Sequence, residues 1–129
     1  MTRDWILLAL RVLSPLVLYA FWGTVIRDLR KTAAPVSARL VAGDDSARVW
    51  RLPPVTTIGR SADNTIAIDD DFASVRHARL VFRGGQWWLE DMRSTNGTWL
   101  NGNRLSAPTP LHSGDTIAVG TQHYRFEQD

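Results

Sequence analysis

From about residue 38 onward, the chain consists of short apolar runs separated at close spacing by turn-forming residues. Several runs alternate apolar and polar residues, which is the period of a strand with one buried face. In the run 65–68, for example, Ile66 and Ile68 fall on the same face. No stretch of helical period appears after residue 38. Many short strands in about 90 residues predict an all-β domain built as a β-sandwich.

Nine runs qualify as strands, and the breaks between them are rich in Gly, Pro, Asn, Asp and Ser residues that favour turns. The pairs Asn96-Gly97 and Asn101-Gly102 favour tight hairpins, since both residue types tolerate positive φ. The predicted strands are residues 39–42, 48–52, 56–58, 65–68, 78–82, 87–90, 98–100, 116–119 and 124–127.

Residues 5–26 form an apolar run of 22 residues, which is long enough to cross a bilayer as a helix. Its twelve Leu, Ile, Val and Phe residues contribute about −5 kcal/mol to insertion, whereas Arg11 costs at most about 3 kcal/mol. Trp5 and Trp22 lie near the two ends, as interfacial aromatic residues do. The run predicts a single uncleaved transmembrane helix. A helix on the membrane surface is the main rival, ahead of a cleaved signal peptide and a helix buried on a partner.

The bases that flank this run set the expected orientation. Arg27, Arg30 and Lys31 follow the run, whereas Arg3 alone precedes it. The positive-inside rule then places the C-terminal domain in the cytoplasm. The expected segments are an anchor helix with its basic flank over residues 1–30, a short linker over 31–37 and a folded domain over 38–129.

Composition excludes several classes of function. The chain has no cysteine, so disulfides, thiolate metal sites and cysteine nucleophiles are ruled out. Residues 1–37 hold five bases and two acids (+3), and residues 38–129 hold ten bases and eleven acids (−1). A nucleic-acid-binding domain carries a basic face of its own. A domain this close to neutral is therefore not expected to bind nucleic acid.

Three turn segments of the predicted domain carry polar side chains that suit a phosphate group. Arg60 can donate two parallel charge-assisted hydrogen bonds to phosphate oxygens, and Ser74 adds a neutral donor. Asn96 has the donors and the acceptor needed to bind an extended peptide backbone. Each residue also has a plain structural interpretation, as an exposed turn residue, a loop cap or a hairpin turn. The three segments are residues 59–61, 73–77 and 94–98.

The ordered set of these residues resembles the forkhead-associated (FHA) domain family. The resemblance covers essentially all of the chain after the linker, and it implies an eleven-stranded β-sandwich whose apical loops bind phosphothreonine. The family prefers phosphothreonine to phosphoserine because a small pocket takes the γ-methyl group, which is worth about 1–3 kcal/mol. The matching stretches are residues 58–60, 64–66, 69, 74–80, 87–91, 94–102, 111, 114–115 and 117–120.

The resemblance also implies a role for each matching residue. Arg60 and Ser74 are expected to hold the phosphate. Asn96 is expected to bond the peptide backbone beside the phosphothreonine, with Thr95 supporting it. The residues expected to keep the loop framework in shape are Gly59, His77 and Gly97.

One position departs from the family pattern. The residue after the serine is often polar or basic in the family and also touches the phosphate, whereas this chain has Val75. Val75 offers only its backbone N–H to a phosphate. Arg76 either compensates as an accessory phosphate contact or points to solvent.

The order of helix and domain also resembles small bacterial membrane proteins that act beside serine/threonine kinases in cell-wall synthesis and division. This likeness implies a single-pass inner-membrane protein whose partners are phosphothreonine-containing proteins, either such a kinase or its substrates. The expected function is a membrane-tethered, phosphothreonine-dependent binding module that uses no cofactor, metal or small-molecule substrate. The alternative is a membrane scaffold that binds its partners independently of phosphate.

Enzymatic alternatives have little support in the sequence. Ser74, His77 and a nearby acid have the residue types of a hydrolase triad, but the chain has no Gly-x-Ser-x-Gly elbow. His112, Asp115 and His123 have the residue types of metal ligands, but their spacing matches no ligand signature. The chain is therefore not expected to be an enzyme.

Overall fold

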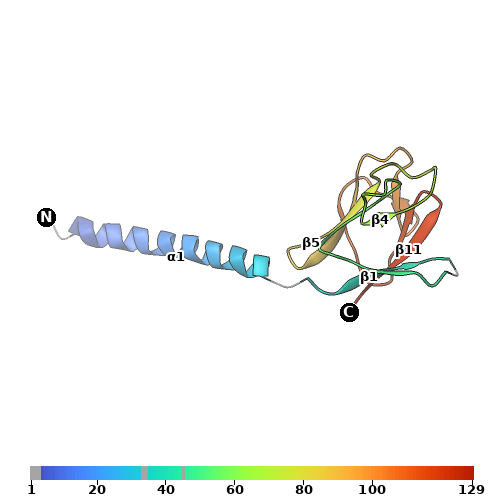
Figure 1. The fold of residues 1–129 in the computed structure, drawn as a ribbon. Helices are drawn as coiled ribbons and strands as arrows, with labels where there is room; N and C mark the ends of the chain where they lie inside the picture. Colours follow the sequence, from blue (N-terminus) through green and yellow to red (C-terminus); the bar gives the residue numbers. More distant parts are fainter. Residues whose placement is uncertain (1–3, 33–34, 45) are drawn as a thin grey trace. The chain divides into compact units, whose positions relative to one another are not determined.

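The computed structural model describes residues 4–32, 35–44 and 46–129, and it describes the backbone alone at residues 5, 10 and 29–32. The chain divides between residues 34 and 35 into two units, a helix and a β domain (Figure 1). Arg3 of the expected flank and residues 33–34 of the expected linker lie outside the described residues, as does Asp45.

The first unit is the helix α1 (Asp4–Thr32), which continues into the segment expected to be the linker. Its large apolar side chains are exposed along its length, from Ile6 (45% exposed) to Ile26 (43% exposed). They include residues at successive positions, which point about 100° apart, so apolar groups lie around the helix rather than along one stripe. Ile6–Asp28 is long and apolar enough to cross a membrane, with a mean hydropathy of 1.8, although an N-terminal signal sequence meets the same criteria.

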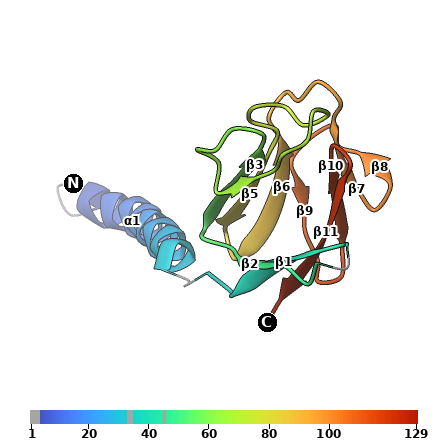
Figure 2. The ribbon, with the colours of Figure 1, turned by 45° about the vertical axis from the view of Figure 1, so that its right-hand side comes forward.

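The second unit is a sandwich of two sheets, with eleven strands among the described residues (Figure 2). The six-stranded sheet has the order β2-β1-β11-β10-β7-β8, and the five-stranded sheet has the order β4-β3-β5-β6-β9. Neighbouring strands are antiparallel except β3 and β4, which are parallel. The strands are β1 (Ala38–Ala42), β2 (Val49–Arg51), β3 (Val55–Gly59), β4 (Ile66–Ala67), β5 (Ala78–Arg83), β6 (Gln86–Asp91), β7 (Thr98–Leu100), β8 (Asn103–Arg104), β9 (Thr109–Pro110), β10 (Thr116–Val119) and β11 (Gln122–Gln128).

Alternation along the strands places one face of each sheet in the core. Tyr124 and Phe126 of β11 are buried, while the residues between and beside them are not. Trp87 of β6 packs against Phe126 with ring centroids 6.2 Å apart, and its Nε1 donates to the Val36 carbonyl at 3.1 Å. The core residues all lie between positions 38 and 126, so the β domain carries a core of its own.

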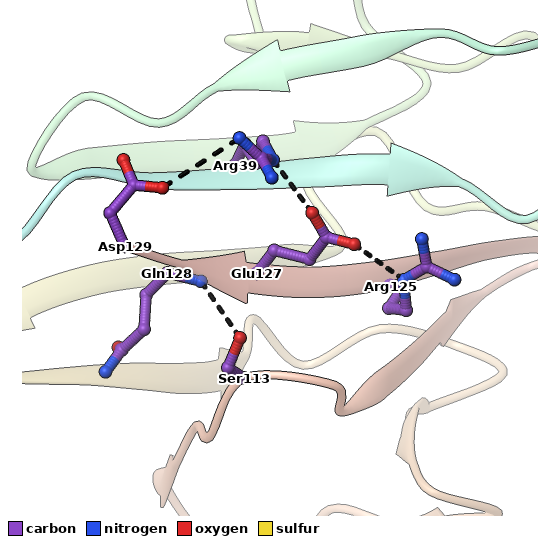
Figure 3. Close-up of polar contacts among 6 residues, drawn as sticks. All are labelled: Arg39, Ser113, Arg125, Glu127, Gln128 and Asp129. Atoms are coloured by element: carbon purple, nitrogen blue, oxygen red, sulfur yellow. Dashed lines mark hydrogen bonds and ion pairs between the residues drawn. The ribbon is translucent and has the colours of Figure 1, made fainter.

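Charged side chains cover the outer face where β1 and β11 pair (Figure 3). Arg39 Nε donates to Glu127 across the pair at 2.8 Å, and Arg125 Nε donates to the other Glu127 oxygen at 2.8 Å. Arg39 also lies 3.9 Å from the Asp129 carboxylate. Exposed pairs of this kind are worth about 0–1 kcal/mol each, so the core rather than this face stabilises the sandwich.

The sequence pattern finds nine of the strands, with ends shifted by at most two residues. It misses β8 and β9, which have two residues each and lie in no alternating run; β4 is equally short, but it lies in the alternating run 65–68. With these two, the structure has the eleven strands that the family resemblance implies. Asn101-Gly102 forms the predicted tight hairpin between β7 and β8, with φ of 50° and 83°. Asn96-Gly97 does not form a hairpin, because it lies in the connection from β6 to β7, which belong to different sheets.

Three connections carry the matching polar residues, and they meet at one end of the sandwich, at the top of Figure 2. They join β3 to β4, β4 to β5 and β6 to β7. Antiparallel pairing of β3 with β5 and of β5 with β6 brings them to the same end. These apical loops are residues 60–65, 68–77 and 92–97.

Candidate functional site

Arg60 and Ser74 belong to two apical loops that are joined through their backbones. The Arg60 N–H donates to the Ser74 carbonyl at 3.0 Å, and the Ser61 N–H donates to the Val75 carbonyl at 3.2 Å. The Arg60 side chain is exposed and has no hydrogen bond or ion pair to another described residue. Its charge is therefore available to an anion at the loop end.

The Ser74 hydroxyl is oriented by the third apical loop. Its Oγ accepts a hydrogen bond from the Thr95 N–H at 3.0 Å, which leaves the hydroxyl proton free to donate. Next to Thr95, Asn96 is exposed and donates one amide N–H to the Phe72 carbonyl at 2.9 Å. The second N–H and the Oδ1 of Asn96 have no partner in the described chain. The site thus presents two donors and an acceptor beside the Arg60 loop.

His77 is fully buried and connects two apical loops through its ring. Nδ1 accepts a hydrogen bond from the Ser74 N–H at 3.0 Å, so the ring proton lies on Nε2, which donates to the Gly97 carbonyl at 2.8 Å. A neutral histidine has one donor and one acceptor, and both are used here. The ring therefore holds the two loops together, and the framework role of His77 in binding stays a prediction.

Gly59 is required by a close approach between backbones. A Cβ atom at this position would lie 2.3 Å from the Val75 carbonyl oxygen and 3.0 Å from the Ser74 carbonyl oxygen. Asn64 fills the adjoining space and donates from Nδ2 to the carbonyls of Ser61 and Val75, both at 2.8 Å. Any larger residue at position 59 would push the Ser74 loop outward.

Gly97 is the second glycine that the site requires. Its φ of 82° is a left-handed conformation that L-residues adopt at a cost. A Cβ atom there would also lie 2.5 Å from Nε of Arg104, a residue of β8. The Arg104 guanidinium therefore covers Gly97, immediately beside Asn96.

Val75 and Arg76 occupy the position where the chain departs from the family pattern. Val75 is 53% exposed, and its N–H has no acceptor among the described residues. Arg76 does not simply point to solvent, because its Nη2 pairs with the Asp63 carboxylate of another apical loop at 3.1 Å. An accessory phosphate contact by Arg76 stays a prediction, and it requires this pair to open.

Two carboxylates that the sequence pattern does not single out hold the apical loops. Asp70 accepts hydrogen bonds from Thr121, at 2.6 Å from the hydroxyl and 2.7 Å from the N–H, and these lower the pKa of Asp70. Burial raises the pKa of Asp91, but hydrogen bonds from Ser94 and Thr98 outweigh burial and lower it. An aspartate often accepts a hydrogen bond from the backbone N–H two or three residues later in a turn. Asp70 accepts from the Phe72 N–H and Asp91 from the Ser94 N–H, so this local signal could have marked both aspartates as turn residues.

The geometry weakens the enzymatic alternatives. Neither ring nitrogen of His77 is directed at the Ser74 hydroxyl, since both are bonded to backbone groups. Asp115 accepts from the His112 N–H at 2.8 Å and from Asn101 at 3.0 Å, which makes it a turn residue. Within residues 4–32, 35–44 and 46–129, no group of three or more His, Asp or Glu side chains is arranged to hold a metal ion.

The sequence model of the FHA domain matches residues 56–120, a range that contains all three apical loops. The chain belongs to the FHA domain family. The expected FHA-type sandwich is likewise confirmed by solved structures. One, from a structural and functional analysis of phosphothreonine-dependent FHA domain interactions, superposes with a TM-score of 0.68 at 30% identity, over 72% of this chain and 97% of the other.

Other FHA proteins are similar over the same region. Mycobacterium tuberculosis EmbR, solved in complex with a low-affinity phosphopeptide, superposes with a TM-score of 0.70 at 31% identity, over 83% of this chain and 29% of EmbR. The FHA domain-containing protein FhaB of Mycobacterium tuberculosis is 39% identical over 74 residues, which are 57% of this chain and 48% of FhaB. The chain thus matches about half the length of this curated relative.

Proposed function

We propose that this chain is a membrane-tethered module that binds phosphothreonine-containing segments of partner proteins and acts with bacterial serine/threonine kinase signalling. The observation that carries the proposal is that two neighbouring apical loops each present a side-chain donor that no described residue uses. The Arg60 guanidinium has no partner in the described chain, and the Ser74 hydroxyl proton is free. Phosphothreonine-dependent interactions of an FHA neighbour and the phosphopeptide bound by EmbR support the same chemistry.

Each proposed contact has a physical reason. A phosphothreonine carries about −1.5 to −2 charge at pH 7 and three acceptor oxygens. Arg60 can pair with two of these oxygens in its fork geometry, and Ser74 can donate to another. Asn96 would then bond the peptide backbone beside the phosphothreonine with its remaining N–H and its Oδ1. Thr95 would support the site through the N–H that already orients Ser74.

The membrane part of the proposal rests on α1. A helix that is apolar all around suits a bilayer better than a surface position, which calls for one apolar and one polar face. At 1.5 Å per residue, Ile6–Asp28 spans about 35 Å, against about 30 Å for the hydrocarbon core. We place the β domain in the cytoplasm of a single-pass inner-membrane protein, with residues 38–129 as the binding domain and cell-wall synthesis or division as the regulated process.

The test is a calorimetric titration of the full chain in neutral detergent micelles with phosphothreonine, phosphoserine and unphosphorylated forms of one peptide library. Arg60→Ala is expected to weaken phosphothreonine binding by about 10- to 150-fold, the loss of a hydrogen bond to a charged group. Arg51→Ala is the matched control, because Arg51 is also exposed and unpaired in the described chain but lies on β2. Partner binding that survives Arg60→Ala would favour the phosphate-independent scaffold.

A further inference from the structure

Unpaired arginines are the starting point for a second binding position. Residues 38–129 contain ten arginines, and six form an ion pair with an Asp or Glu. Four have no ion pair to a described residue, and Arg60 of the proposed phosphate site is one of them. The other three are Arg51, Arg93 and Arg104.

Arg104 lies against the apical loop that carries Asn96. It belongs to β8 and pairs across the ladder with Trp99 of β7. The three atoms closest to a Cβ built on Gly97 are all from Arg104: Nε at 2.5 Å, Cζ at 3.0 Å and Cδ at 3.2 Å. Packing on the Gly97 backbone, rather than a carboxylate, therefore positions this guanidinium one residue away from Asn96.

A hollow of about 260 Å³ adjoins Arg104 on the β7–β8 side of the domain. No acidic side chain lines it, so Arg104 provides its only formal charge among the described lining residues. The hollow is large enough for a side chain, and Arg104, which lines it, also lies over Gly97 beside Asn96. The other residues that line it are Leu100, Asn101, Asn103, Leu105, Ser106 and Thr109.

We propose that Arg104 is a specificity-determining residue that binds a second anionic group in the segment flanking the phosphothreonine. An exposed guanidinium without a carboxylate partner attracts a carboxylate or a phosphate, and its fork can bond either in two places. The inference rests on the proposed function, because the phosphothreonine at Arg60 and Ser74 sets where the flanking residues run. The favoured partner is therefore a phosphothreonine segment with an added acidic or phosphorylated residue nearby.

The test compares sets of peptides built around one phosphothreonine, titrated against the full chain in neutral detergent micelles. One peptide has neutral flanks, a second set carries Asp at single positions from −4 to +4, and a third carries phosphoserine at the same positions. The Asp and phosphoserine arms distinguish a carboxylate from a second phosphate. Arg104→Gln removes the charge but keeps a stem over Gly97, and Arg104→Ala removes both. Arg51→Ala is the charge-matched control.

At one or more flanking positions, the anionic peptides are expected to bind the unaltered chain about 3- to 10-fold more tightly than the neutral peptide. Arg104→Gln and Arg104→Ala should both abolish this gain while changing neutral-peptide affinity by less than about 2-fold, and Arg51→Ala should retain it. The assignment of Arg104 would be overturned if phosphothreonine peptides bind but an added anionic residue raises the affinity at no flanking position. It would also be overturned if Arg104→Gln shows the same rise in affinity as the unaltered chain. Absence of phosphate-dependent binding in the unaltered chain would instead reject the proposed function.

Discussion

At the residue scale, Gly97 meets two separate constraints. Its φ of 82° disfavours any side chain, and Arg104 occupies the space that a Cβ would need. Gly85 has a comparable φ of 76° but nothing within 4 Å of a built Cβ. The pair of glycines therefore allows the conformational cost to be separated from the steric cost.

Gly85→Ala is expected to lower the free energy of unfolding by about 1–2 kcal/mol, the cost of a left-handed L-residue. Gly97→Ala should lose that amount and about 0.5–1.5 kcal/mol more, because the added methyl group forces the exposed Arg104 side chain out of its position over Gly97. Combining Gly97→Ala with Arg104→Ala should recover the second part. Urea unfolding of the four proteins measures these differences. Equal losses at the two glycines would mean that Arg104 does not restrict position 97.

At the scale of elements, the apical loops are held by bonds that connect distant strands. Asp70 ties the β4–β5 loop to Thr121 in the turn from β10 to β11. His77 ties the same loop to Gly97, and Asp91 of β6 holds Ser94 and Thr98. The loops therefore depend on both sheets for their shape.

Acid is expected to loosen these loops before it affects the core. The pKa values of Asp70 and Asp91 are lower in the folded protein than in the unfolded chain, where the pKa of an aspartate is about 4. The hydrogen bonds of both carboxylates therefore stabilise the fold fully above about pH 4. This stabilisation is lost as the pH falls through the lowered pKa. Asp70→Asn should thus reduce the free energy of unfolding at pH 7 and progressively less toward pH 3. Urea unfolding across pH measures this, with Asp71→Asn as an exposed control. A destabilisation by Asp70→Asn that does not change with pH would contradict the assigned role.

Strand periodicity was sufficient for nine of the eleven described strands but not for the geometry of the site. The bond from Asp70 to Thr121 crosses 51 residues of sequence, so no local pattern reveals it. Period alone also gives no reason for Arg60, Ser74 and Asn96 to meet, because they lie on three different connections. The family resemblance predicted that these three residues lie close together. It did not indicate that Arg76 would pair with Asp63.

At the scale of the whole molecule, the chain combines a helix that is apolar all around with a domain that carries its own core. The core residues lie between positions 38 and 126, so the described helix contributes none of them. The β domain is therefore expected to fold in the same way whether or not α1 is in a bilayer.

The proposed membrane anchor predicts that the full chain resists alkaline extraction from cell membranes. Changing Leu16 and Val17 together to Arg adds about 5–7 kcal/mol to insertion, which exceeds the favourable sum of the apolar residues. The double Arg variant should therefore move to the soluble fraction, and the matched double Ala variant should stay with the membrane. Release of the unaltered chain by alkali would favour the surface helix, and a shortened mature mass would identify a signal peptide.

The position of β1 has a mechanical consequence. β1 follows the segment after α1, lies between β2 and β11 in its sheet, and begins beside the last residues of β11. The apical loops lie toward the other end of β11, where Thr121 meets Asp70. If the chain is fixed on the N-terminal side of β1 and a partner pulls on the apical loops, the force acts along the length of β1. The ladder hydrogen bonds from β1 to β2 and β11 would then bear the load together, in shear. An anchored domain that holds a partner as proposed would thus transmit tension without unzipping strand by strand.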